Sequence, residues 1–229
     1  MKTIGVLGGL GPQATMDFEA RVHASSQRLI PQRGNEGYPP MVVFYYRHAP
    51  ILLHEDGSPV LPIQPDPRLF DAARRVGSLA DFLVITANGP HMLREAIEQA
   101  AGRPVLSMID VTLDEVRRRG CRTLGVLGLG EPTVYLDPLG RLGLACETID
   151  GDLRDRLDRA IAGLMEGRTG PESSAVAHEA VDTLRGRGVD GVILGCTEIP
   201  LLLGEAAGAP DLLNPAEVLA EATVRHAIA

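Results

Sequence analysis

Two stretches of the chain repeat one layout: a short apolar run, a turn of small or polar residues, and the start of a helix. In the later stretch the run is 192–194, Gly195 frees the backbone, and Cys196 follows. In the earlier stretch the run is 82–85, and Ala87 takes the place of Cys196. Short apolar runs rich in β-branched residues are typical of buried parallel strands. The repeat therefore predicts two related α/β halves.

Predicted strands and helices alternate along the whole chain, which predicts an α/β fold with mainly parallel sheets. We predict two similar three-layer domains, residues 1–105 plus 213–229 and residues 106–212. The active site is expected in the interdomain cleft, at the carboxyl ends of the strands. Residues 104–108 are predicted to form a short strand, and a helix is predicted from about His91 to Ala101.

Cys196 has two interpretations. Thr197 is a suitable N-cap for the helix predicted after it, with Pro200 near the helix start. The sulfur of Cys196 would then lie near a helix N-terminus, whose dipole lowers a thiol pKa and makes the cysteine a usable base or nucleophile. The alternative is a buried structural cysteine, since free cysteine is among the most buried residue types.

The composition excludes several classes of function. The formal net charge of -8, without a long basic run, argues against a nucleic-acid partner, and 3% aromatic content with no Trp argues against base stacking. The histidines are too scattered to predict a metal site. No apolar run is long enough to span a membrane. Three cysteines without CxxC spacing, and a start that lacks the pattern of a secretory signal, predict a cytoplasmic location.

Three motifs resemble one family of enzymes. Residues 195–198, Gly-Cys-Thr-Glu, resemble a signature of the aspartate/glutamate racemase superfamily, and residues 87–91 resemble its Cys-Asn-Thr-x-His loop in altered form. Residues 4–12 look like its amino-terminal glycine loop. The similarity spans the chain, including the Asn-Pro-Ala of residues 214–216. The resemblance implies an amino-acid racemase that needs no cofactor and acts on a small carboxylate or amino acid. It also implies a homodimer.

The resemblance further implies which residues form the site. Cys196 is the acid/base that carries the α-proton, and Ala87 occupies the place of the family's first catalytic cysteine. Asn88 and Thr197, with their backbone amides, are the donors that hold the substrate carboxylate. Arg47 is placed to contact a carboxylate, with a solvated surface arginine as the alternative. The other expected substrate-binding residues are Gly9, Gly89 and Thr133.

A methyl group cannot transfer a proton, so Ala87 excludes a mechanism with two thiols. Three explanations stay open. The first is a racemase or epimerase in which Cys196 works with Thr86, His91 or a water. The second is a one-thiol decarboxylase or isomerase, resembling arylmalonate decarboxylase. The third is a carboxylate-binding protein without turnover, or a variant whose first cysteine was replaced by alanine.

Overall fold

The computed structural model describes residues 1–229, which form two compact units. Unit 1 comprises Met1–Met108 with Leu219–Ala229, and unit 2 comprises Ile109–Val218. In each unit a parallel sheet lies between two layers of helices, as the alternation of strands and helices predicts. The α/β class with parallel sheets is therefore confirmed.

The sheet of unit 1 has the strand order β2-β1-β3, with every pair parallel. Its strands are β1 (Ile4–Gly8), β2 (Met41–Tyr45) and β3 (Phe82–Ile85). Its helices before the boundary are α1 (Pro12–Leu29), α2 (Pro67–Gly77), the 3-10 turn η1 (Gly89–Leu93) and α3 (Arg94–Ala101). The end of α9 (Pro215–Ile228) also belongs to this unit.

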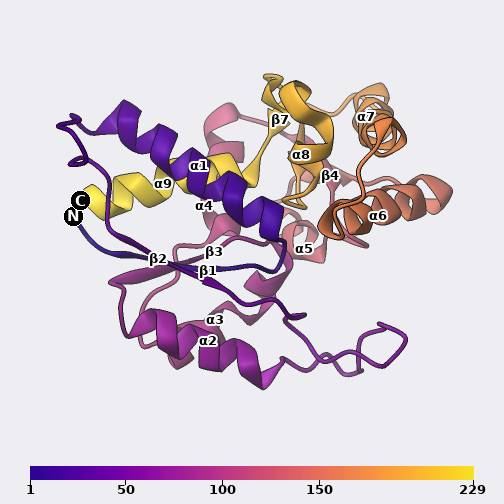
Figure 1. Ribbon diagram of the computed structural model, residues 1–229. Helices are drawn as coiled ribbons and strands as arrows, with labels where there is room; N and C mark the ends of the chain where they lie inside the picture. The colour runs from indigo at the N-terminus through magenta and orange to yellow at the C-terminus, as the bar shows by residue number, and fades with distance from the viewer. The chain divides into compact units, whose positions relative to one another are not determined.

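The two faces of this sheet are covered by different helices. Figure 1 shows α2 and α3 on one face, and α1 with the end of α9 on the other. Successive side chains of a strand point to opposite faces. Leu7 and Ile85 accordingly pack in the core cluster that α2 and α3 share. On the opposite face, the Phe82 ring meets the ring of His226 from α9 at 4.5 Å.

Unit 2 repeats this arrangement, because the first strand of its sheet is again central, with the second and third strands on either side. The order is β5-β4-β6-β7, all parallel. The strands are β4 (Thr123–Leu127), β5 (Ala145–Glu147), β6 (Gly191–Leu194) and β7 (Leu212–Leu213). The helices are α4 (Met108–Arg119), α5 (Thr133–Arg141), α6 (Gly151–Met165), α7 (Pro171–Gly186), α8 (Ile199–Leu203) and η2 (Gly204–Gly208).

Alternation along β6 again separates two core layers. Val192 and Leu194 pack with α6, α7 and α8, whereas Ile193 packs with α4 and α5. All three side chains have no exposed surface. Such a strand has no solvent face, which explains why its sequence is a continuous apolar run rather than an alternating one.

Two predictions about the end of unit 1 are wrong in detail. Residues 104–108 form no strand, since only one isolated parallel bridge joins Leu83 and Val105, and α4 already begins at Met108. The helix predicted from His91 to Ala101 is divided into η1 and α3, because residues 89–93 form a 3-10 turn before the α-helix begins at Arg94. The predicted domain boundaries remain a prediction.

Gly77 sets how closely α2 can approach α3. A Cβ atom at this position would lie 2.2 Å from the carbonyl oxygen of Ala101. We expect Gly77→Ala to lower the free energy of unfolding by about 1–3 kcal/mol, as overpacking of a well-packed core usually does. Thermal unfolding followed by circular dichroism measures this effect. Gly186→Ala is the control, since a Cβ there meets nothing within 4 Å; equal melting temperatures for the two variants would contradict the prediction.

Candidate functional site

The loops of unit 1 that follow β1, β2 and β3 leave from one edge of the sheet. Gly8 pairs with Tyr45 and Leu7 with Ile85, so the three strands end at the same level. Gly9 lies in the first loop with φ 75°, and a Cβ there would lie 2.5 Å from Tyr45 Cα. Only glycine fits such a position. Its amide donates to Thr15 Oγ1 at 2.8 Å, so this N–H already has a partner.

Two buried hydroxyl groups join the first loop to the third. The Oγ1 atoms of Thr15 and Thr86 lie 2.9 Å apart, and Thr15 Oγ1 also bonds the Gly11 carbonyl at 3.1 Å. Because Thr15 donates its only hydroxyl hydrogen to Gly11, Thr86 donates to Thr15. Thr86 is 1% exposed. Its hydroxyl proton is thus used to hold the loops together.

His91 fixes the loop that carries Ala87. Its Nε2 accepts the backbone N–H of Met108 at 3.0 Å, so this nitrogen carries no proton. Its Nδ1 is therefore the protonated nitrogen, and it donates to the Ala87 carbonyl at 2.9 Å. The ring is buried and neutral in this arrangement. Proton transfer by His91 would require breaking one of these bonds, which makes its role that of positioning the loop.

Ala87 is the second residue after β3, as Cys196 is the second residue after β6. The backbone N–H of Ala87 donates to no acceptor in the protein. The side chain of the next residue, Asn88, is buried, and Gly89 is exposed at the start of η1. The loop therefore carries a backbone donor at Ala87, next to Asn88, the residue that the resemblance places against the substrate carboxylate.

Arg47 follows β2 in an unusual backbone conformation. Its φ of 63° makes it the non-glycine residue with positive φ in this structure. The left-handed region costs a residue with a side chain about 1–2 kcal/mol. Its N–H donates to the Gly9 carbonyl at 3.3 Å, and its guanidinium lies 4.7 Å from the ring centroid of Tyr45. The guanidinium is exposed and forms no ion pair with a carboxylate of the protein.

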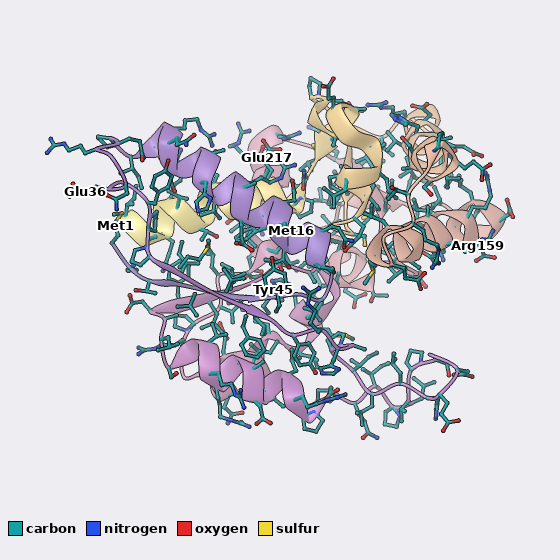
Figure 2. The ribbon with its side chains drawn as sticks, viewed as in Figure 1. Met1, Met16, Glu36, Tyr45, Arg159 and Glu217 are labelled. Atoms are coloured by element: carbon teal, nitrogen blue, oxygen red, sulfur yellow. The ribbon has the colours of Figure 1, made fainter.

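Tyr45 is itself held in place. Its hydroxyl donates to Glu19 Oε1 of α1 at 2.9 Å, and Figure 2 labels Tyr45 just below this helix. A fixed ring gives the guanidinium of Arg47 a surface to lie on. The pair leaves the N–H donors of Arg47 available for an external carboxylate.

In unit 2 the corresponding edge carries a thiol and a buried carboxylate. Leu127 of β4 pairs with Leu194 of β6, and Gly195 N–H continues the ladder to the Leu127 carbonyl at 2.7 Å. Cys196 Sγ donates to Glu198 Oε2 at 3.0 Å. Thr197 Oγ1 donates to the same oxygen at 3.1 Å. Glu198 is only 4% exposed, so its carboxylate depends on these two donors in place of water.

This arrangement raises the pKa of the Cys196 thiol well above its usual value. The largest cause is burial of the sulfur, and the next is the negative charge of Glu198, to which the thiol is hydrogen-bonded. Of the two interpretations of Cys196, the one in which a helix dipole lowers the thiol pKa is therefore wrong. The helix is too short for a strong dipole, since α8 contains only 5 residues. Its N-cap is Glu198 rather than Thr197, so the predicted capping role of Thr197 is also wrong.

Two backbone donors lie in the same loop as the thiol. The N–H groups of Cys196 and Thr197 donate to no acceptor in the protein. Neighbouring N–H groups of this kind suit the oxygens of a carboxylate that gains charge. Thr133 lies at the first residue of α5, after the loop that follows β4, and its side chain is exposed.

Glu198 is a candidate site residue that was not among the residues predicted from the sequence. It is the last residue of the Gly-Cys-Thr-Glu motif, so a signal was present: an acidic residue two positions after a candidate thiol. A second carboxylate, Asp158 of α6, adds to the negative potential at the thiol. Its Oδ1 accepts the N–H of Gly130, in the loop that follows β4, at 2.9 Å.

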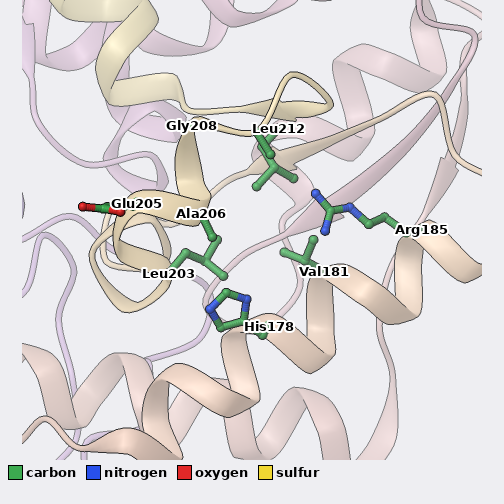
Figure 3. A pocket seen from close by; sticks show the side chains of 9 residues that line it. His178, Val181, Arg185, Leu203, Glu205, Ala206, Gly208 and Leu212 are labelled. Carbon is green, nitrogen blue, oxygen red and sulfur yellow. The ribbon is translucent and has the colours of Figure 1, made fainter.

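Unit 2 also contains a cavity of about 390 Å³ that does not include the thiol. Figure 3 shows its walls, which come from α7 on one side and from α8, η2 and β7 on the other. Arg185 lines this cavity, but Asp211 binds its guanidinium at 2.7 and 2.9 Å. No group of three or more His, Cys, Asp or Glu side chains is placed to hold a metal ion. No helix combines the length and apolar character needed to cross a membrane.

Comparison with known proteins places the chain in a family. The model of the Asp/Glu/hydantoin racemase family matches residues 7–223. The chain belongs to the Asp/Glu/hydantoin racemase family. It is 24% identical over 225 residues to the broad specificity amino-acid racemase RacX of Bacillus subtilis (strain 168), covering 96% of each chain. The resemblance to aspartate/glutamate racemases is thus confirmed, and the chain is an enzyme, a racemase-like isomerase.

Solved structures agree with this family in their fold. An aspartate racemase from Picrophilus torridus has a TM-score of 0.80 at 18% identity, with 99% of this chain and 94% of that chain covered. The structure of a putative Asp/Glu racemase from Yersinia pestis has a TM-score of 0.76 at 22% identity, with both chains fully covered. The α/β architecture of this chain is therefore that of Asp/Glu racemase structures.

The raised pKa of Cys196 leads to a test of the thiol itself. Glu198→Gln removes the negative charge but keeps the size of the side chain and an oxygen that can accept the S–H bond. We expect the Cys196 thiol of this variant to react faster with iodoacetamide near neutral pH, because more of it is ionised. In the unchanged protein its rate should rise only above the pKa of an ordinary thiol, about 8.5.

The rates are measured by peptide mapping after brief labelling, with Cys121 and Cys146 as internal references. Burial raises the pKa of both reference thiols, and neither contacts Glu198. Glu205→Gln changes an exposed carboxylate of η2 and serves as the control. If labelling of Cys196 is equally slow in both variants, the Glu198 charge does not control this thiol.

Proposed function

We propose that this enzyme moves the proton on the α-carbon of an amino acid, without a cofactor, with Cys196 as the acid/base. The observation that carries the proposal is the hydrogen bond of 3.0 Å from the Cys196 thiol to the buried Glu198 carboxylate. It joins a proton carrier to a proton acceptor at the end of a parallel strand. The broad specificity amino-acid racemase to which the chain is similar supports an amino-acid substrate.

The raised pKa decides the order of the proton transfers. At rest the sulfur holds its proton, so Cys196 begins as an acid. To act as a base it first gives this proton to Glu198 Oε2, which becomes a neutral carboxylic acid. The thiolate then takes the α-proton, and the substrate becomes an enediolate. Return of a proton from the thiol to the same carbon restores the substrate, and Glu198 returns its own proton to the sulfur or to solvent.

The enediolate needs donors for its two oxygens, since its charge develops there. We propose the free N–H groups of Cys196, Thr197 and Ala87 for this role, with Asn88 and Gly89 as further substrate-binding residues. Arg47 is proposed to bind a carboxylate, because its guanidinium is exposed and has no ionic partner. Gly9 and Thr133 complete the proposed substrate-binding set.

A second acid/base is the open part of the mechanism. Ala87 has no proton to give. Thr86 and His91 use their polar atoms to hold the loops, which argues against them as proton donors. Of the three candidates for the second acid/base, which are Thr86, His91 and a water, only the water remains. We propose that solvent protonates the second face of the enediolate, so that inversion is slower than exchange at the face that Cys196 serves.

A second candidate function is supported by the same thiol. A cysteine that is protonated at rest is suited to deliver a proton to a carbanion that forms without removal of an α-proton. Loss of carbon dioxide from a substituted malonate, or isomerisation of a carboxylate, would need only this one step.

The wider assignments are proposals of the same kind. The shared strand order of the two sheets supports two racemase-like domains, residues 1–105 plus 213–229 and residues 106–212. We also propose a small carboxylate or amino acid as the substrate, a homodimer as the assembly, and the cytoplasm as the location.

Incubation in heavy water tests the proposed function. We expect deuterium to enter the α-position of one enantiomer faster than the other enantiomer accumulates, because only one face has a protein acid/base. Chiral chromatography with mass spectrometry measures both rates. Cys196→Ser raises the pKa of the proton carrier far beyond the working range and should abolish exchange without unfolding the protein. A folded Cys196→Ser variant with unchanged exchange would remove Cys196 from the mechanism. Carbon dioxide release from a substituted malonate would instead support the second candidate.

Ala87→Cys tests whether the missing group limits inversion. The variant places a thiol at the position that corresponds to Cys196 in the repeated layout. We expect faster racemisation, since proton transfer by a positioned group typically contributes ~10²–10⁴-fold. The measurement is the ratio of racemisation to deuterium exchange, with Ala87→Ser as the control of similar size. An unchanged ratio in Ala87→Cys would mean that the alanine does not limit inversion.

A further inference from the structure

Tyr135 is a titratable side chain of unit 2 that the proposed mechanism does not use. It lies on α5, has no exposed surface, and packs in the core cluster that also contains Ile193 of β6. Its hydroxyl is hydrogen-bonded to the hydroxyl of Thr112 on α4, which is also fully buried. Burial raises the pKa of the Tyr135 phenol, so the phenol stays neutral and is no proton carrier. Because a buried hydroxyl needs its hydrogen-bond partner, Thr112 fixes the position of the ring.

The ring of Tyr135 lies against the residue that precedes the thiol. A Cβ atom on Gly195 would lie 3.1 Å from Cδ2 and 3.2 Å from Cε2 of this ring. The same atom would lie 2.5 Å from the carbonyl oxygen of Leu127, which accepts the Gly195 N–H at 2.7 Å. Gly195 is therefore held between the backbone of β4 and the tyrosine ring, with no room for a side chain.

Tyr135 and the Cys196 thiol lie on opposite sides of the loop. Ile193 packs in the same cluster as Tyr135, whereas Leu194 belongs to the other cluster, against which Cys196 packs. Alternation along the chain therefore turns Gly195 toward the ring and Cys196 away from it. The ring supports the loop from behind, so the position of Gly195 determines where the sulfur lies.

We infer that Tyr135 is a positioning residue for Cys196. Its ring, which Thr112 holds, fixes Gly195 and keeps the thiol at hydrogen-bond distance from Glu198, 3.0 Å from Oε2. This inference rests on the proposed function, in which Cys196 moves the α-proton of an amino acid. It concerns the position of the thiol, whereas the proposed function concerns its reaction. The two can fail separately, because the environment of a thiol can be measured without turnover.

Two variants test the ring and its hydroxyl. Tyr135→Leu removes the ring, so the loop can relax into the space behind it and the thiol can move away from Glu198. We expect kcat for α-deuterium exchange to fall by roughly 10- to 100-fold, with a smaller change in KM, since a misplacement of about 1 Å can cost ~10²-fold. Tyr135→Phe keeps the ring and removes only the hydroxyl. It should lower kcat by roughly 2- to 10-fold, the equivalent of one net hydrogen bond.

Labelling of Cys196 with iodoacetamide is the readout that needs no turnover. Away from the negative charge of Glu198 the thiol ionises more readily, so labelling should become fast at a lower pH in Tyr135→Leu than in the unchanged protein. Tyr135→Phe should shift this pH profile in the same direction by a smaller amount. Cys146 is the internal reference, because it packs against the cluster that contains Tyr135 and reports any general loosening of that core.

Leu139→Ala is the matched control. Leu139 is fully buried one turn further along α5 in the same cluster, so its truncation also lowers the melting temperature. It should leave kcat and the labelling profile of Cys196 unchanged. A lower melting temperature in both variants, with a changed profile and kcat only in Tyr135→Leu, supports the inference.

The inference is overturned if the labelling profile of Cys196 in Tyr135→Leu equals that of the unchanged protein. If Tyr135→Leu does not fold, the profile of Tyr135→Phe decides in the same way. A shifted profile in a protein that exchanges no deuterium, with or without the substitution, supports the inference and contradicts the proposed function alone.

Discussion

The register of the parallel strands is the constraint on which the candidate site depends. Because β1 ends level with β2 and β3, the loops after these strands meet at one edge, where Gly9 N–H and Thr86 can both bond Thr15. In unit 2, β4 ends level with β6, and the same rule brings Asp158 and its loop to Cys196. A slip of one residue in either sheet would turn every side chain to the other face and separate these groups.

Much of the fold could be predicted because strands that are buried on both faces consist of apolar residues. The run 192–194 is apolar at each position, since the strand has helices on both faces, and the same holds for 82–85. Residues 104–108 read as a third such strand, yet only Val105 forms a bridge. The segment enters α4 at Met108, before a ladder can form. The length of a strand also depends on where the following helix begins, and a local apolar pattern does not contain that information.

The position of Cys196 at a strand end could be predicted from the sequence, but the electrostatics around its thiol could not. The motif placed Cys196 at a strand end correctly, and the strand-turn-helix pattern suggested a helix dipole beside it. The helix that formed is short, and a carboxylate two residues away faces the sulfur. A dipole acts through partial charges, whereas Glu198 carries a full charge at hydrogen-bond distance in a buried place. Burial of the sulfur and, after it, this carboxylate outweigh the helix, so the thiol pKa is raised rather than lowered.

This difference changes what a single thiol can do. A cysteine that a helix dipole keeps ionised could act as a base as soon as a substrate binds. In the proposed mechanism, a thiol that is hydrogen-bonded to Glu198 uses that carboxylate as its proton acceptor, so the acid/base unit that we propose is the pair and not the cysteine alone. Such a pair can both donate a proton to one face of a carbon and remove a proton from that face. The Ala87 loop is positioned by bonds of His91 and Thr86, but its alanine has no proton to transfer. Both loops are thus held in place, but only the Cys196 loop carries a thiol, which is why the proposed mechanism separates exchange from inversion.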